Sequence, residues 1–138
     1  MRDTSLIGTY RMGERVQVGP LVYQVLESDW RSELGPGGKA PKNRFLFVKV
    51  SITNSTGSAI TVPGLTALGP GTTYIEETEN MDRVENWLGL IRNIQPSQTE
   101  QGWIVFDAPI ASYKLALTDA GEIGKEKFAH VEIPVQLE

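Results

Sequence analysis

The residue types that carry catalytic chemistry at neutral pH are scarce in this sequence. It contains a single histidine, His130, and no cysteine. Catalysis usually requires a tuned acid–base pair or a nucleophile activated by a neighbouring base, and no Gly-x-Ser-x-Gly nucleophile elbow occurs. Alternation along the final apolar stretch places His130 on the polar face, opposite Val131 and Ile133. We therefore predict an exposed strand histidine, no catalytic residues and a protein that is not an enzyme.

A glycine-rich stretch over residues 35–39, with the sequence GPGGK, has the outline of a phosphate-binding loop. The Walker pattern requires glycine at position 33 and serine or threonine at position 40, where this chain has Glu33 and Ala40. We interpret the stretch as a flexible connection inside a long loop over residues 28–43. The sequence predicts no cofactor and no cofactor-binding residues.

Five carboxylates are concentrated in a short stretch: Glu76, Glu77, Glu79, Asp82 and Glu85. Calcium is bound by several carboxylates and carbonyls from one loop, but the EF-hand pattern needs a central glycine and alternating acidic positions, which this cluster lacks. We expect a solvated acidic helix or loop and predict no metal ligands. Whether the cluster 76–85 binds a cation is left open at this point.

The three tryptophans, Trp30, Trp87 and Trp103, are the candidates for an interaction surface. Trp103 and Ile104 are neighbours in an apolar strand, so one of them must point away from the main core. An exposed tryptophan on a sheet often marks a contact surface. The alternative is that a flanking loop or the segment 79–88 covers it, because isolated apolar surface residues are common.

These residues must be positioned by β-strands, because apolar and polar residues alternate along most of the chain between clusters of Gly, Pro and Asn. The clearest strand spans 45–53. The pattern predicts an all-β, immunoglobulin-like antiparallel β-sandwich of seven to nine strands over residues 13–138, after a flexible N-terminal tail over 1–12. Spacings of three and four between Met81, Val84 and Leu88 predict one short helix near 79–88.

Composition narrows the range of partners. The chain of 138 residues has the size of one domain and a net charge of −4 that is spread along its length. Nucleic-acid binders concentrate basic residues on one face, so we predict no nucleic-acid partner. No apolar run of about 18 residues could cross a membrane, and the first residues do not have the pattern of a signal peptide.

Three separated motifs resemble, in the same order, those of a bacterial family of uncharacterised small extracellular domains. They are GERVQVG at 13–19, FVKVSITN at 47–54, and IQPS at 94–97 followed by GWIVFDAP at 102–109. Ser97 stands where the family usually has glycine. The resemblance implies an immunoglobulin-like fold related to a secreted mycobacterial immunogenic protein, export or attachment to lipoproteins, and no catalytic activity. Some members carry an automatic label, telomeric repeat-binding factor-like, which the acidic balance of this chain does not support.

Four motif residues have structural roles that can be argued from their types. We expect Val50 and Phe106 to anchor the core, and Gly102 to allow a bulge or a close backbone approach. Asn54 should serve a turn through left-handed geometry and bonds to its own backbone. The tripeptide 54–56 fits the glycosylation sequon, which indicates an exposed turn.

The sequence thus favours a non-catalytic binding or scaffold module outside the cytoplasm that acts through loops or a sheet face. The alternative is a small-ligand carrier with a pocket under the 28–43 loop or between the sheets. We expect the partner to be a protein or a component of the cell envelope, and a homodimer formed by edge strands is a further option. We expect a location at the cell surface or in the periplasm, which requires a signal or lipobox segment that is absent from this numbering. Attachment to a membrane would likewise require an N-terminal anchor that is absent from this numbering. The alternative location is the cytoplasm.

Overall fold

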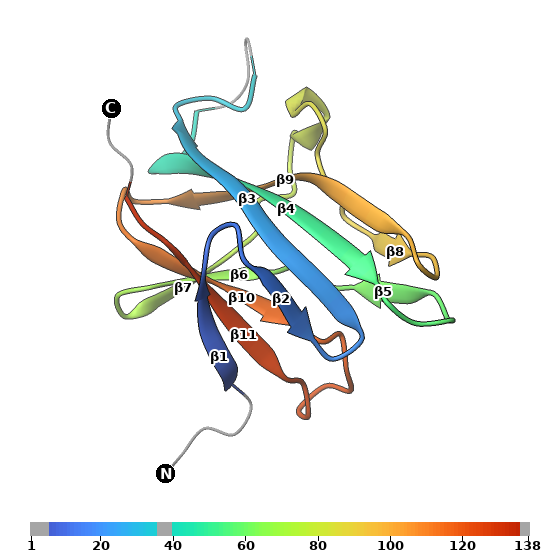
Figure 1. Cartoon of the computed structure of the whole chain (residues 1–138). Helices are drawn as coiled ribbons and strands as arrows, with labels where there is room; N and C mark the ends of the chain where they lie inside the picture. Colours follow the sequence, from blue (N-terminus) through green and yellow to red (C-terminus); the bar gives the residue numbers. More distant parts are fainter. Residues whose placement is uncertain (1–5, 36–39, 136–138) are drawn as a thin grey trace.

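The computed structural model describes residues 6–35 and 40–135. It consists of β-strands and one 3₁₀ turn, arranged as two stacked sheets with a small two-stranded sheet beside them (Figure 1). The elements are β1 (Leu6–Arg11), β2 (Arg15–Val18), β3 (Leu21–Arg31), β4 (Arg44–Asn54), β5 (Ile60–Val62), β6 (Thr66–Gly69), β7 (Thr72–Ile75), η1 (Met81–Arg83), β8 (Arg92–Ile94), β9 (Thr99–Ala108), β10 (Tyr113–Thr118) and β11 (Phe128–Ile133).

The strand order is β1-β11-β10-β6-β7 in one main sheet and β2-β3-β4-β9 in the other, while β5 pairs with β8. All of these pairs are antiparallel except β1 with β11. The predicted all-β sandwich is confirmed. The described residues form eleven strands instead of seven to nine, because several strands of three or four residues lie where the sequence shows only broken alternation.

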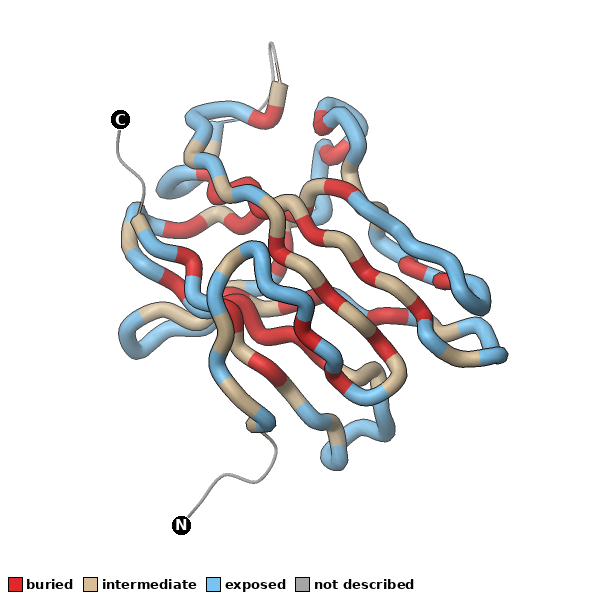
Figure 2. Tube along the Cα trace, viewed as in Figure 1, coloured by how far each residue is buried: buried red, intermediate tan, exposed pale blue. Residues whose placement is uncertain are grey.

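The main core lies between the two large sheets. Leu46, Val48, Val50 and Ile52 alternate along β4 and are fully buried, as the period-two pattern predicts. Figure 2 shows the same alternation of buried and more exposed positions along the strands. Phe106 on β9 is also fully buried, in agreement with its expected role as a core anchor.

A second, smaller apolar cluster covers part of the outer face of the four-stranded sheet. Phe45 and Phe47 of β4 and Val105 of β9 point to this face. They are covered by residues from the connections on either side, and the buried members of the cluster are Leu34, Phe45, Phe47, Met81, Val84 and Val105. The outer face of a sheet can therefore be apolar here, because the connections supply a lid that buries it.

Two boundaries differ from the sequence-based expectation. The predicted flexible tail over 1–12 is wrong for residues 6–11, which form β1 and pair with residues 128–132 of β11; residues 1–5 lie outside the described part. The predicted loop 28–43 begins later, because β3 continues to Arg31 and pairs with β4 up to Phe45. The helix expected near 79–88 is a single 3₁₀ turn, η1.

Candidate interaction surface

The three tryptophans are all half-buried, and they lie in two different places. Trp30 packs against the main core, with its ring centroid 6.2 Å from that of Tyr113. Trp87 and Trp103 pack against the second cluster instead. A β-bulge between Val25 and Glu27 explains the position of Trp30, because the extra residue reverses which side chains of β3 face inward.

The segment 79–88, which the sequence offered as a cover for the tryptophan, pairs with the backbone of β9 at Trp103, whose side chain is half-buried. The Trp103 backbone N–H donates to the Asn86 carbonyl at 2.8 Å, and the Leu88 N–H donates to the Trp103 carbonyl at 2.9 Å. Gly102 makes this approach feasible, since a Cβ atom there would overlap the Asn86 carbonyl oxygen and lie 3.1 Å from the Leu88 nitrogen. The close backbone approach predicted at Gly102 is confirmed. Whether any tryptophan contacts a partner stays a prediction.

Cations lie over the aromatic rings on this face. The Arg31 guanidinium carbon is 4.2 Å from the Phe47 ring centroid and 5.2 Å from that of Trp103. The Lys49 ammonium lies 5.9 Å from Trp103. Such contacts favour the charge over the ring face, so part of the exposed aromatic surface is already occupied by this chain's own side chains.

The acidic cluster does not act as one group. Glu77 accepts the backbone N–H groups of Thr78 and Glu79, each at 3.1 Å, and Asp82 and Glu85 are exposed. Within residues 6–35 and 40–135, no group of three or more acidic or histidine side chains is placed to hold a metal ion. The expectation of a solvated acidic face is wrong for one residue, Glu76, which is buried.

Glu76 forms a buried ion pair with Arg92 of β8. The exposed fractions of the two side chains are 5% and 2%. One guanidinium nitrogen, Nη1, donates to Oε2 at 2.8 Å and the other, Nη2, donates to Oε1, so the pair is bidentate. Arg92 also donates to the carbonyls of Gly89 and Pro63, while Glu76 accepts the Leu65 N–H at 2.6 Å. The pair therefore joins the connection before β6, the connection after β7 and the residues before β8.

An apolar hollow of about 220 Å³ lies over this ion pair. Its sides include Ile75, at the end of β7, and Leu90, just before β8; these side chains are 77% and 62% exposed. Ile91, which follows Leu90, is 78% exposed. The hollow is lined by Gly64, Leu65, Thr66, Ile75, Glu76, Thr78, Leu90 and Arg92. Sequence reasoning missed it, because apolar residues are expected inside and charged ones outside.

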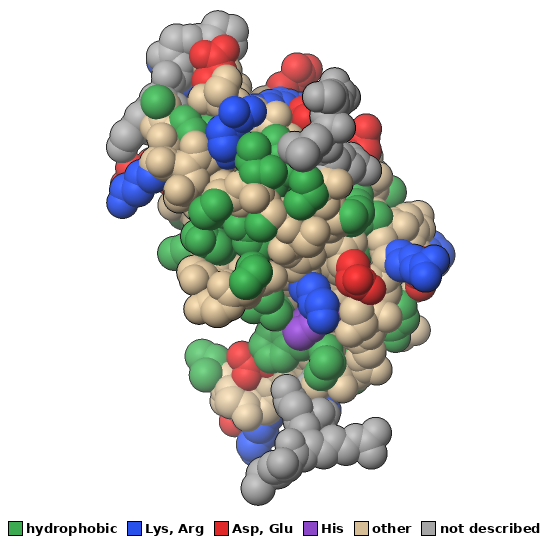
Figure 3. Space-filling view, turned by 90° about the vertical axis from the view of Figure 1, so that its left-hand side faces the viewer, with side chains coloured by type: hydrophobic (Ala, Val, Ile, Leu, Met, Phe, Trp, Pro, Cys, Tyr) green, Lys and Arg blue, Asp and Glu red, His purple; other side chains and the backbone are tan. Residues whose placement is uncertain are grey.

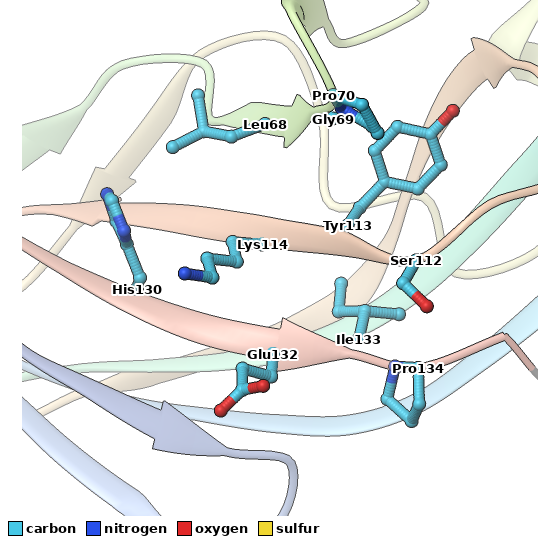
Figure 4. A pocket seen from close by; sticks show the side chains of 10 residues that line it. All are labelled: Leu68, Gly69, Pro70, Ser112, Tyr113, Lys114, His130, Glu132, Ile133 and Pro134. Atoms are coloured by element: carbon cyan, nitrogen blue, oxygen red, sulfur yellow. The ribbon is translucent and has the colours of Figure 1, made fainter.

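A wider hollow of about 500 Å³ lies on the outer face of the five-stranded sheet. Figure 4 shows Lys114, His130 and Glu132 projecting from β10 and β11 on this face, with Leu68 of β6 beside them. The predicted placement of His130 on the polar face is confirmed, but the expectation that it is exposed is wrong, because the residue is half-buried. The space-filling view of this side shows hydrophobic side chains mixed with charged ones around the single histidine (Figure 3).

The pocket proposed under the 28–43 loop can be located. A hollow of about 300 Å³ lies between the described part of that loop and the segment after β7. Asp107 lines it and uses both carboxylate oxygens to accept the backbone N–H groups of Lys42 and Asn43, at 2.8 and 2.9 Å. None of its lining residues is a tryptophan. Carriage of a small ligand there stays a prediction.

Asn54 is a structural residue rather than an exposed one. Its side chain is fully buried, and its amide donates to the carbonyls of Ser58 at 2.7 Å and Ile94 at 2.9 Å. Its oxygen accepts the Thr56 N–H at 2.9 Å. The predicted bonding to nearby backbone is confirmed, but the predicted left-handed geometry is wrong, since Asn54 is not among the described residues with positive φ. The inference of exposure from the sequon is wrong at this residue as well.

In the part of the chain that the structure describes, no helix has the length and apolar character needed to cross a membrane.

Several solved structures share the fold. The yjhA protein of Bacillus subtilis matches with a TM-score of 0.66 and 14% identity, over 88% of this chain and 98% of that one. The secreted protein MPT63 of Mycobacterium tuberculosis matches with a TM-score of 0.64 and 14% identity, over 91% and 96% of the two chains. The ycdA protein of Bacillus subtilis, provisionally classed as a lipoprotein, matches with a TM-score of 0.69 and 14% identity, over 90% of this chain but 39% of its own.

No curated protein matches the chain in sequence. The model of one family, described as a domain of unknown function (DUF4352), matches residues 10–129 and therefore most of the sandwich. The order of the three sequence motifs, the two-sheet fold and this match agree, and the chain belongs to the DUF4352 family.

Proposed function

We propose that this protein is a non-catalytic binding module that works outside the cytoplasm and contacts a protein or another component of the cell envelope. The observation that carries the proposal is the apolar hollow with Ile75 and Leu90 at its rim and Ile91 beside Leu90. Large aliphatic side chains that gather at an exposed hollow are typical of contact sites. The two ionisable side chains that line this hollow, Glu76 and Arg92, are paired with each other.

The location rests on the relatives. A secreted protein of Mycobacterium tuberculosis and a Bacillus subtilis protein provisionally classed as a lipoprotein share the fold. Both descriptions support a place outside the cytoplasm for this chain. Protease treatment of intact native cells, with a cytoplasmic protein as the internal control, tests this: digestion of the chain with the control left whole supports the location, and protection of both contradicts it.

The contact is tested by photo-crosslinking in the native cells. A photoreactive residue placed at Leu90 should give a discrete adduct with an envelope component that mass spectrometry can identify. The same residue at Ile123, which is 93% exposed on another connection, is the matched control. An adduct at Leu90 and not at Ile123 supports the proposal. Equal labelling at both positions, or no adduct at either, contradicts it.

A further inference from the structure

We infer that the free edge of β7 accepts an extended peptide segment of a partner as an added strand, with an aliphatic side chain of that segment seated in the hollow beside Ile75 and Leu90. This inference rests on the proposed function and names the chemical class of its partner. It combines two independent features of the same place: unused backbone hydrogen-bonding groups and an apolar hollow of about 220 Å³.

The backbone groups follow from the β6–β7 hairpin. Gly69 and Thr72 flank a two-residue turn in which Gly71 has φ of 69°. Residues that flank such a turn exchange hydrogen bonds, and the pairing then alternates along the antiparallel ladder. Thr73 and Ile75 therefore occupy positions whose N–H and C=O groups point away from β6. As β7 is the last strand of its sheet, no strand of that sheet uses these groups, and an incoming strand can bond to them. The free stretch of edge ends at Ile75, because the next N–H that points away from β6, that of Glu77, already donates to the Val105 carbonyl of β9.

Two of the other edges, those of β9 and β1, offer less. On the four-stranded sheet, the β9 edge is already occupied: Trp103 exchanges hydrogen bonds with Asn86 and Leu88, and the Glu77 N–H donates to the Val105 carbonyl at 2.7 Å. The outer strand β1 has a register irregularity between Leu6 and Gly8, which interrupts a regular ladder. At β7 the free edge runs directly into the hollow, because Ile75 ends the strand and lines the hollow.

The side-chain geometry fits an aliphatic residue. Tyr74 faces the core and packs against Tyr113 with ring centroids 5.8 Å apart, so Ile75, its neighbour, faces the outer surface. A residue of an added strand directly opposite Ile75 would share that face, with Cβ atoms about 5 Å apart. Its side chain would then lie between Ile75 and Leu90, over a floor whose charges are already paired with each other.

A second copy of this chain fits less well than a peptide. In a symmetric antiparallel pair of two β7 strands, only residues whose backbone groups point outward can lie opposite each other, so Ile75 of one copy would face Thr73 or Ile75 of the other. A four-residue strand also covers only about 14 Å of edge, whereas stable interfaces bury about 1,200–2,000 Å². Strand addition by a short peptide needs only the edge and one or two side-chain pockets.

The charge of the neighbouring segment indicates the composition of the peptide. Residues 77–85, which follow β7 by way of Glu76, carry four carboxylates and one arginine: Glu77, Glu79, Asp82, Glu85 and Arg83. In antiparallel addition, the residues that precede the aliphatic anchor approach the start of this segment. We therefore expect lysine or arginine before the anchor, which complementary charge favours over acidic residues.

The test is a titration of the isotopically labelled protein with blocked hexapeptides, followed by amide chemical shifts. One set has the form KKTLTV, with leucine, isoleucine or valine as the anchor, and a matched set carries EE in place of KK. We expect saturable shifts at Thr72–Glu77 and Leu90 for the basic set and binding weaker by at least about tenfold for the acidic set.

Two variants localise the binding, and one serves as control. T73P removes an N–H that β6 does not use and places a ring on the edge; Leu90→Asp puts a charge on the hollow; Ile123→Asp is equally exposed but remote. Binding should fall at least about tenfold in the first two and stay unchanged in the third. If T73P fails to fold, Leu90→Asp decides.

Absence of shifts for all peptides up to about 1 mM, or shifts that survive Leu90→Asp, would overturn the inference. The proposed function can fail separately, because photo-crosslinking at Leu90 reports any partner. An envelope adduct without peptide binding at β7 overturns the strand-addition inference and leaves the binding module in place.

Discussion

Removing Arg92 should destabilise the protein far more than removing any exposed charge. Arg92→Met keeps most of the aliphatic volume but leaves the Glu76 carboxylate buried, with the Leu65 N–H as its remaining donor. The substitution removes both hydrogen bonds that Arg92 donates to Glu76 and those that it donates to the carbonyls of Gly89 and Pro63. Breaking a buried pair by removing one partner costs about 3–5 kcal/mol, and here both side chains are at most 5% exposed.

The free energy of unfolding can be measured by urea denaturation, with the slope m checked for constancy. Asp29→Asn is the control, because it breaks the exposed Asp29–Arg31 pair, whose side chains are 54% and 42% exposed; a loss of at most about 1 kcal/mol is expected there. The double change of Glu76→Leu with Arg92→Met should cost less than Arg92→Met alone, since no lone charge stays buried. A loss below about 1 kcal/mol for Arg92→Met, or a double variant less stable than the single one, would refute the reasoning.

Three further predictions concern the core and its hydrogen bonds. Gly102→Ala should cost about 1–3 kcal/mol in urea unfolding, because its methyl group would press on the Asn86 carbonyl; an unchanged midpoint would show that the segment 79–88 can move away freely. Asn54→Ala should cost about 2–4 kcal/mol, since it leaves buried carbonyls without donors, and the folded protein should carry no glycan at Asn54 by mass spectrometry when made in a glycosylating host. Burial raises the pKa of Tyr23 above its ordinary value of 10.0, and its hydroxyl donates a hydrogen bond to the Thr118 carbonyl. The folded state thus holds this proton more tightly than the unfolded chain, so stability is fully present below pH 10 and declines as pH rises beyond it; Tyr23→Phe should weaken that decline, and an unchanged pH profile would assign it to other groups.

The sequence was sufficient to predict the central strands and their inward faces. It was insufficient where contacts between distant parts of the chain determine the position of a side chain or strand. Val48 and its neighbours on β4 alternate without interruption, so their inward face is visible from the pattern alone. Trp30 could not be placed in that way, because the bulge before Glu27 reverses the alternation and leaves no mark in the residue types. β1 escaped prediction for a related reason: its inward positions are only half-buried, so its pattern is weak.

The candidate surface could not be predicted from the sequence, because a charged residue is buried there and apolar residues are exposed. Arg92 is charged and yet buried, because its partner Glu76 lies sixteen residues earlier and only the folded chain brings them together. Leu90 and Ile91 are apolar and yet exposed. Each assignment inverts the usual partition of residue types between core and surface, and a single sequence holds no periodic signal that would reveal the inversion.

The parallel pairing of β1 with β11 has a mechanical consequence. Because the first and last strands lie side by side and run in the same direction, a pull on the two ends of the domain loads this pair along its length. The inter-strand hydrogen bonds between Leu6–Arg11 and Phe128–Glu132 then share the tension and must yield together, instead of opening one after another from an end. A domain held at one terminus and pulled at the other would therefore resist stretching through the pair of strands that closes its chain, and its lifetime under force would follow the unfolding rate rather than the equilibrium stability.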